Sequence, residues 1–171
     1  DNADVQNFEG DAHRMDLYSR QIGAYGVEAM AKLIKMKVAI VGLRGVGIEA
    51  AKNLVLAGPG AVTLVDEAVV QTRDLGTNFF LREADVGTNT RAAASAKHLQ
   101  ALNRLVDVKA HSGPLSEDLV RAHTALMLCN PTRAEALKWN KFCRANNVGF
   151  FLTGVHGLFG YAFVDLGDEF T

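Results

Sequence analysis

Apolar and polar residues follow two alternating spacings along most of the chain. Short apolar runs predict buried strands, and the segments between them, in which apolar residues recur every three or four positions, predict amphipathic helices. Strands are expected at residues 37–41, 61–65, 106–112, 125–128 and 149–153, and helices at residues 45–57, 90–103, 116–122 and 134–146. Residues 157–167 (GLFGYAFVDLG) predict a closing strand or hairpin, in which Phe159, Tyr161 and Phe163 pack or pair with a period of two.

Strands that alternate with helices predict a mostly parallel sheet covered on both faces, because each parallel connection needs a crossover. Before the first strand, residues 16–34 contain a helix start, a glycine interruption and a second helical stretch. Residues 1–15 are mostly polar and aperiodic, so we expect a flexible N-terminal segment there. The prediction is therefore one doubly wound, Rossmann-like α/β domain over residues 16–171.

Composition excludes several classes of function. The 171 residues amount to about one domain, and the net charge of −1 provides no general basic field for nucleic acid or for an acidic membrane surface. No apolar stretch approaches the roughly 20 residues of a membrane span. The two cysteines, Cys129 and Cys143, form no C-x-x-C pair and no secretory signal is evident, which indicates a reduced intracellular protein with packed cysteines.

A glycine-rich turn, GLRGVG, follows the apolar run KVAIV. Dinucleotide-binding turns carry glycines at the first, third and sixth positions, for the tight turn, the approach of the pyrophosphate and helix packing. Gly42 and Gly47 match the first and last positions, but the third position is occupied by Arg44 instead of a glycine. We expect the glycines to serve folding and Arg44 to obstruct a pyrophosphate; the alternative is that Arg44 and the helix start bind an anion. Asp66 lies about 20 residues further on, where a ribose-binding acid would be.

The chain resembles the N-terminal adenylation-type domain of ubiquitin-activating enzymes, with a ThiF/MoeB-like fold, in four stretches: LYSRQIGAYGVEAMAKL, VGLRGVGIEAAKNLVLAG, LVDEAVVQTRDLGTNFFLREADVG and GLFGYAFVDLGDEF. In that family two homologous adenylation domains of one long chain form a pseudo-dimer. One half binds ATP, Mg²⁺ and the ubiquitin C-terminus, and the N-terminal half is inactive. The same fold forms homodimers that adenylate sulfur-carrier proteins in bacteria. The resemblance implies a protein of the cytoplasm and nucleus.

The resemblance also indicates which half this chain corresponds to. Active halves use a ribose-binding aspartate, a second aspartate, an asparagine and an arginine after the second strand, then a lysine and a Mg²⁺-associated aspartate. The matching positions here are Asp66, Ala68, Gly76, Thr77, Thr90 and Pro131. Arg91 replaces the lysine only if the register slips by one. Without these groups the negative charge that develops during adenylation is not stabilised. We expect a degenerate site (Gly42, Arg44, Gly45, Gly47 and Asp66) with no metal ligand and no cofactor of its own, ATP and Mg²⁺ being held by the active half.

One functional residue of the family is retained. The resemblance implies that Arg20, in YSRQ, crosses the pseudo-dimer interface to the ATP of the active half. A guanidinium suits this role because it is always charged and engages phosphate oxygens in a fork. The expected partners are the active half and ubiquitin, with no nucleic acid and no membrane. The family continues into a catalytic-cysteine half-domain, so we expect an N-terminal fragment whose two cysteines form no thioester.

Three alternatives stay open. One is the inactive subunit of a heterodimeric enzyme that activates SUMO or another ubiquitin-like protein, although YSRQ and GLFG favour the ubiquitin version. Another is a nicotinamide-dependent oxidoreductase, which Arg44 and the lack of a hydride-transfer site oppose. The third is an active homodimeric adenylyltransferase, which Ala68, Thr77, Thr90 and Pro131 oppose.

Overall fold

A six-stranded sheet forms the centre of the domain. The computed structural model describes residues 2–168, and its strands are β1 (Lys37–Val41), β2 (Ala61–Val65), β3 (Asp107–His111), β4 (Ala125–Cys129), β5 (Gly149–His156) and β6 (Phe159–Asp165). Their order across the sheet is β3-β2-β1-β4-β5-β6. The first five strands are parallel, and β6 returns antiparallel to β5. The predicted mostly parallel α/β sheet is confirmed.

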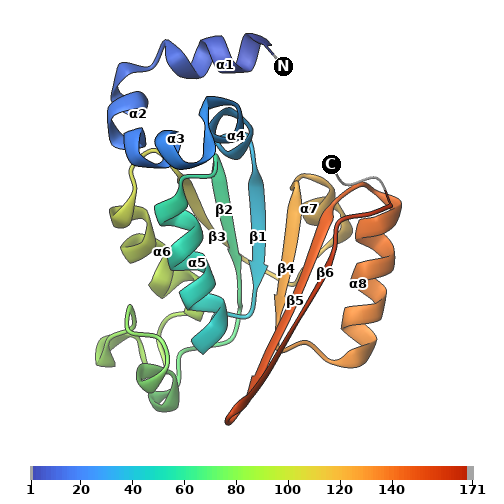
Figure 1. The fold of residues 1–171 in the computed structure, drawn as a ribbon. Helices are drawn as coiled ribbons and strands as arrows, with labels where there is room; N and C mark the ends of the chain where they lie inside the picture. Colours follow the sequence, from blue (N-terminus) through green and yellow to red (C-terminus); the bar gives the residue numbers. More distant parts are fainter. Residues whose placement is uncertain (1, 169–171) are drawn as a thin grey trace.

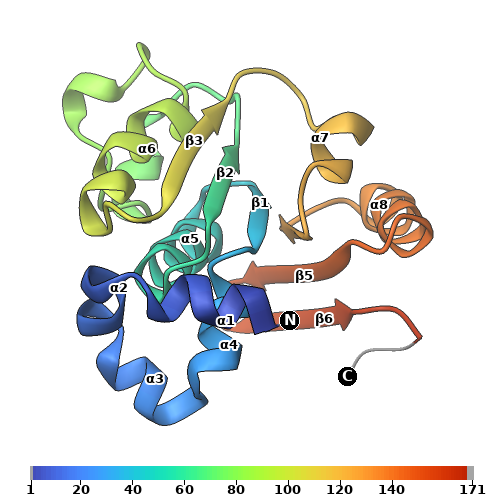
Figure 2. The ribbon, with the colours of Figure 1, turned by 90° about the horizontal axis from the view of Figure 1, so that it is seen from above.

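Helices cover both faces of the sheet (Figures 1 and 2). On one face lie α5 (Gly45–Ala57) and α6 (Arg91–Leu102), and on the other lie α7 (Glu117–Arg121) and α8 (Arg133–Ala145). These helices and the strands β1 to β4 begin and end within one residue of their predicted bounds. Strand β5 is longer than predicted. It runs three residues beyond residue 153 because the hairpin with β6 continues the hydrogen-bond ladder.

The central strand β1 shows why the sheet needs two layers of helices. Val38 and Ile40 are buried in the cluster that packs on α5 and α6. Ala39 points to the opposite face and is buried with Trp139 and Cys143 of α8. Since successive side chains of a strand alternate between the two faces, a continuous apolar run is buried on both of them.

The N-terminal region differs from its prediction. Residues 2–15, expected to be flexible, form α1 (Asn2–Glu9) and most of α2 (Ala12–Leu17). Phe8 is 1% exposed and packs in one cluster with Tyr18 and Met30. Residues 2–15 thus contain helices that the aperiodic sequence did not predict, because sparse apolar side chains such as Phe8 pack against the following helices.

Two further helices, α3 (Ser19–Tyr25) and α4 (Val27–Leu33), complete the N-terminal region. They meet at Gly26, whose φ of +85° ends the first helix, so the predicted glycine interruption is confirmed. All four N-terminal helices gather at one end of the sheet in Figures 1 and 2. Within residues 2–168, every helix is too short or too polar to span a bilayer.

Candidate functional site

The glycine turn between β1 and α5 is held by contacts that leave no room for side chains. Gly42 has a φ of +87°, and a Cβ there would lie 2.8 Å from the carbonyl oxygen of Cys129. A Cβ on Gly47 would lie 1.8 Å from the carbonyl oxygen of Gly42, whereas one on Gly45 would meet no atom within 4 Å. Gly42 and Gly47 therefore serve the fold of the turn, as predicted, and Gly45 has no such role.

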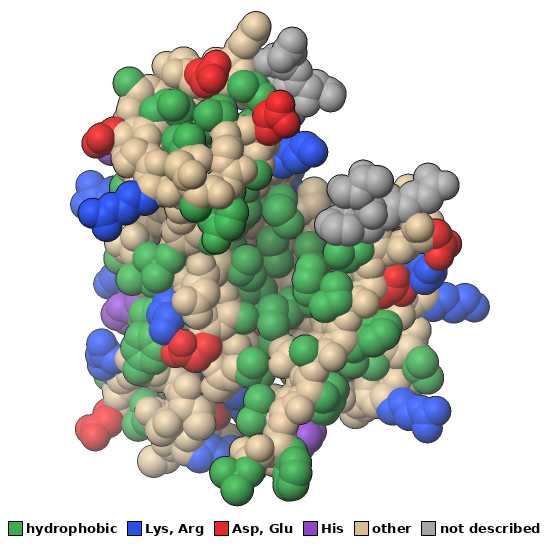
Figure 3. Space-filling view, viewed as in Figure 1, with side chains coloured by type: hydrophobic (Ala, Val, Ile, Leu, Met, Phe, Trp, Pro, Cys, Tyr) green, Lys and Arg blue, Asp and Glu red, His purple; other side chains and the backbone are tan. Residues whose placement is uncertain are grey.

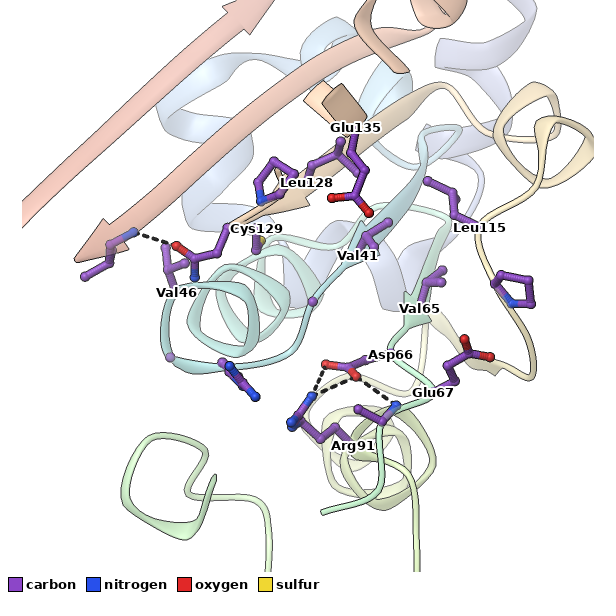
Figure 4. A pocket seen from close by; sticks show the side chains of 18 of the residues that line it. Val41, Val46, Val65, Asp66, Glu67, Arg91, Leu115, Leu128, Cys129 and Glu135 are labelled. Carbon is purple, nitrogen blue, oxygen red and sulfur yellow. Dashed lines mark hydrogen bonds and ion pairs between the residues drawn. The ribbon is translucent and has the colours of Figure 1, made fainter. Parts of the chain in front are cut away.

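A cavity of about 780 Å³ opens beside this turn, at the carboxyl ends of β1, β2 and β4. This is the edge at which open α/β sheets bind ligands. Figure 4 shows the side chains that face into it, with those of Asp66 and Arg91 directed at one another. The cavity is lined by four residues of the degenerate site, which are Gly42, Arg44, Gly45 and Asp66, and also by Thr77, Arg91 and Pro131. The structure thus brings together positions that are up to 90 residues apart in the chain.

The carboxylate of Asp66 is engaged by neighbours within the domain. Oδ2 accepts a hydrogen bond of 2.8 Å from the backbone N–H of Leu43, and Oδ1 accepts one of 3.2 Å from that of Ala68. Nη1 of Arg91 donates to both oxygens, at 3.0 and 3.1 Å. The Asp66 side chain is only 8% exposed. The acid expected to bind ribose already has an internal counter-ion and two amide donors.

Arg91 joins this pair to a second buried carboxylate. Its Nε donates to Oδ2 of Asp74 at 2.8 Å, and the two side chains are 6% and 2% exposed. Burial opposes ionisation of Asp74, but the Gln71 amide and the Arg91 guanidinium outweigh it and hold the pKa of Asp74 below its ordinary value. Burial likewise opposes the charge on Arg91, and the two carboxylates outweigh it, so that the pKa of Arg91 is raised. Asp74 and Arg91 therefore both stay ionised at neutral pH.

Arg44 belongs to the edge of the same cluster. Its Nε lies 3.7 Å from Oδ1 of Asp74, and its side chain is 51% exposed where it lines the cavity. At the backbone, Arg44 is the extended residue that precedes α5, with φ and ψ of −84° and 171°. The arginine in the turn is therefore half-exposed and is ion-paired with a buried protein carboxylate.

Two buried polar residues near the cavity were missing from the sequence-based site. Asp74 accepts from the N–H of Gln71 at 2.9 Å and so stabilises the 3₁₀ turn η1 (Thr72–Gly76). Asn78 is fully buried and donates to the carbonyl oxygen of Leu43 at 3.3 Å and to Oγ of Ser95 at 3.0 Å. Both sit in the polar stretch after β2, where no local pattern distinguishes a buried polar residue from an exposed one.

Thr90 and the residues beside Pro131 have ordinary structural roles. Thr90 caps α6, because its hydroxyl accepts from the N–H of Ala93 at 3.2 Å. Beside Pro131, the Glu135 carboxylate accepts from the hydroxyl and N–H of Thr132 in a capping box, and these bonds hold the pKa of Glu135 below its ordinary value. Among the described residues, no group of three or more His, Cys, Asp or Glu side chains is arranged to hold a metal ion.

Arg20 lies far from this cavity. It is an exposed residue of α3 and lines a separate hollow with Leu56 and Leu102, near the ends of α5 and α6. The glycine turn lies at the other end of α5, whose 13 residues rise about 20 Å. No hydrogen bond or ion pair joins the Arg20 side chain to another residue in the part of the chain that the structure describes. Arg20 therefore lines a hollow other than its own domain's cavity, and its side chain has no ion-pair or hydrogen-bond partner within residues 2–168.

The two cysteines are packed and unreactive in character. Burial raises the pKa of the Cys129 thiol to about 12. Burial and the nearby Asp165 raise that of Cys143 to about 11. Because the thiolate is the nucleophile, neither side chain suits covalent chemistry near neutral pH.

Sequence comparison identifies the family. The ThiF family model matches residues 18–167, nearly the whole chain. The chain belongs to the ThiF family. This ThiF-family domain is 42% identical over 153 residues to ubiquitin-like modifier-activating enzyme 1 of Homo sapiens, covering 90% of this chain and 14% of that protein. It is 42% identical over 158 residues to ubiquitin-activating enzyme E1 1 of Triticum aestivum, covering 91% of this chain and 15% of that protein.

These identities confirm the resemblance drawn from YSRQ, GLRGVG and GLFG. The ThiF-family domain spans about one-seventh of the length of either relative. Among solved structures, the selenomethionine form of PaaA matches with a TM-score of 0.74 and 21% identity, covering 86% of this chain and 49% of that chain. This second likeness shows the fold alone.

Proposed function

We propose that this ThiF-family domain is the adenylation-inactive half of a ubiquitin-activating enzyme. It pairs with an adenylation-competent half as a pseudo-dimer, contributes Arg20 to the ATP bound there, and helps support ubiquitin during the first step of ubiquitin conjugation. ATP and Mg²⁺ are held by the partner half, and this domain binds neither by itself.

The state of Asp66 carries the proposal. Both carboxylate oxygens are engaged by Arg91 and by backbone amides, so binding a ribose would require breaking a buried ion pair. Near the cavity, the positions that hold a Mg²⁺-associated aspartate and a phosphate-binding arginine in active halves are Pro131 and Thr77. Electrostatic stabilisation of a leaving pyrophosphate needs several such groups at once.

The position of Arg20 supports a role in trans. It is exposed, it has no partner among the described residues, and it lies at the end of α5 opposite the glycine turn, about 20 Å away by the rise of that helix. An arginine side chain cannot bridge that length to its own domain's cavity. A nucleotide that Arg20 contacts is therefore one bound by another domain.

The β5–β6 hairpin supports pairing with another domain. Strand β6 is at the edge of the described sheet, and large apolar side chains on the hairpin are exposed, with Leu158 at 101% and Phe159 at 82%. Figure 3 shows hydrophobic side chains gathered over this face and continuing towards the N-terminal helices. An edge strand with exposed aromatic residues is a site for association with another protein surface.

Calorimetry and pyrophosphate exchange test the proposal. With Mg²⁺-ATP, the domain alone should bind no nucleotide and exchange no pyrophosphate, and the domain paired with an active half should do both. In the pair, Arg20→Ala should slow adenylation by about 100- to 1000-fold, the size of effect seen when one charge-stabilising donor is lost. The matched control is Arg104→Ala, because Arg104 is exposed and lines the same hollow. Tight ATP binding with exchange by the domain alone would refute the inactive assignment.

A further inference from the structure

Tyr18 is a buried residue two positions before Arg20. It is 4% exposed and lies between α2 and α3, with its carbonyl oxygen accepting from the N–H of Ile22 at 2.8 Å in the first turn of α3. Its ring lies directly on the backbone of Gly58, where a Cβ would be 2.4 Å from the phenolic oxygen. The φ of +94° at Gly58 also favours glycine. The end of α5 is thus shaped to receive this tyrosine.

A single buried hydrogen bond joins this tyrosine to the end of α6. Nδ2 of Asn103 donates to Oη of Tyr18 at 2.9 Å and to the carbonyl oxygen of Val55 at 3.0 Å. Oδ1 of Asn103 accepts from the N–H of Leu105 at 3.1 Å, and the residue is 8% exposed. All of these partners are fixed parts of the sheet-covering layer. The asparagine therefore ties the start of α3 to the body of the domain across 85 residues of sequence.

We infer that the Tyr18–Asn103 hydrogen bond positions Arg20 for its contact with the partner's nucleotide. The Arg20 side chain has no partner among the described residues, so the direction from which it leaves the domain depends on the backbone of the first turn of α3. That turn follows Tyr18, which is buried and is hydrogen-bonded to Asn103 at the C-terminal end of α6. Tyr18 acts through Arg20 and is a positioning residue. The inference rests on the in-trans role proposed for Arg20.

The expected consequence concerns nucleotide use and not ubiquitin use. Tyr18→Phe keeps the buried ring but leaves one N–H of Asn103 without its acceptor, which loosens the start of α3. An arginine that is not held in place less often adopts the orientation in which its guanidinium contacts a phosphate. Small displacements of such groups lower the reaction rate. The effect should therefore fall on kcat or on KM for ATP, with KM for ubiquitin unchanged.

A pair of tyrosine variants tests the inference in the full chain assembled with the adenylation-competent half. In ATP–pyrophosphate exchange, Tyr18→Phe should lower kcat/KM for ATP by about three- to tenfold, the scale of one lost hydrogen bond. Tyr25→Phe is the matched control, since Tyr25 lies in the same helix but is 73% exposed. In the double variant with Arg20→Ala, Tyr18→Phe should cause no further loss, because it acts only through Arg20.

Each outcome decides a different point. If Arg20→Ala leaves exchange unchanged, the proposed in-trans role fails and this inference fails with it. If Arg20→Ala slows exchange but Tyr18→Phe has the same kcat/KM for ATP as Tyr25→Phe, only the positioning role is overturned. The same holds if the fold losses in kcat/KM from Tyr18→Phe and Arg20→Ala multiply in the double variant. Should Tyr18→Phe not fold, Asn103→Ser removes the same hydrogen bond from the α6 side and is expected to show the same selective loss.

Discussion

Nη1 of Arg91 lies 3.0 Å from Oδ1 and 3.1 Å from Oδ2 of Asp66, with the two side chains 6% and 8% exposed. This buried pair, extended by Asp74, occupies the carboxyl edge of the sheet, where open α/β sheets bind ligands. A guanidinium built into the domain thus supplies the positive charge beside the acid. The arrangement pairs the buried carboxylate of Asp66 without any ligand.

Removal of Arg91 should destabilise the domain severely. Arg91→Ala leaves Asp66 and Asp74 buried without a counter-ion, and breaking such a pair costs about 3–5 kcal/mol. The free energy of unfolding in urea measures the effect. Arg73→Ala provides the control, because this arginine lies in the adjacent 3₁₀ turn and is exposed. Equal stability of the two variants would show that the cluster contributes nothing to folding.

Asp74 should make the domain sensitive to acid. Its pKa in the folded state lies below the ordinary value of 3.8, so between the two values the unfolded chain binds more protons. The stabilisation is therefore fully present above about pH 4 and is lost as the pH falls through the folded pKa. Urea unfolding between pH 7 and pH 2 should show a flatter acid limb for Asp74→Asn. Asp118→Asn, at a 97% exposed carboxylate, should keep the wild-type slope.

Two glycines of the turn should respond oppositely to the same substitution. Gly47→Ala forces a Cβ to within 1.8 Å of the Gly42 carbonyl oxygen, and displacing backbone should cost about 3 kcal/mol or more. Gly45→Ala meets no atom within 4 Å in the first turn of α5, so it should be neutral or stabilise by up to about 1 kcal/mol. Thermal unfolding of both variants checks this. A tolerated Gly47→Ala would contradict the close approach at the turn.

The exposed hairpin should be needed for pairing and not for folding. Phe159 is 82% exposed, so Phe159→Ser should leave the thermal midpoint nearly unchanged while weakening association with the active half by about tenfold or more. Leu137→Ser on α8, at 63% exposure, is the control for general loss of surface apolarity. Analytical ultracentrifugation of the mixed halves gives the affinities. Unchanged association for Phe159→Ser would place the pairing surface elsewhere.

Local patterns were sufficient for most of the architecture. The spacing of apolar residues placed β1, α5 and β2 at their observed bounds, because each element's period is set by neighbouring residues. The glycines at the first and last positions of GLRGVG were recognised for the same reason, since a tight turn needs them locally. The family motifs, which are also contiguous stretches, led to a resemblance that the 42% identities confirm.

Tertiary structure alone decided the packing of the N-terminus and the state of the site. Phe8 becomes a core residue only because Met30 folds back on it. Arg91 meets Asp66 across 25 residues, and Tyr18 meets Asn103 across 85. Isolated polar or apolar residues at such separations leave no period in the sequence, and their pairing depends on where the sheet brings the chain together. The pattern of residues thus specifies the elements, and the fold decides which lone side chains become partners.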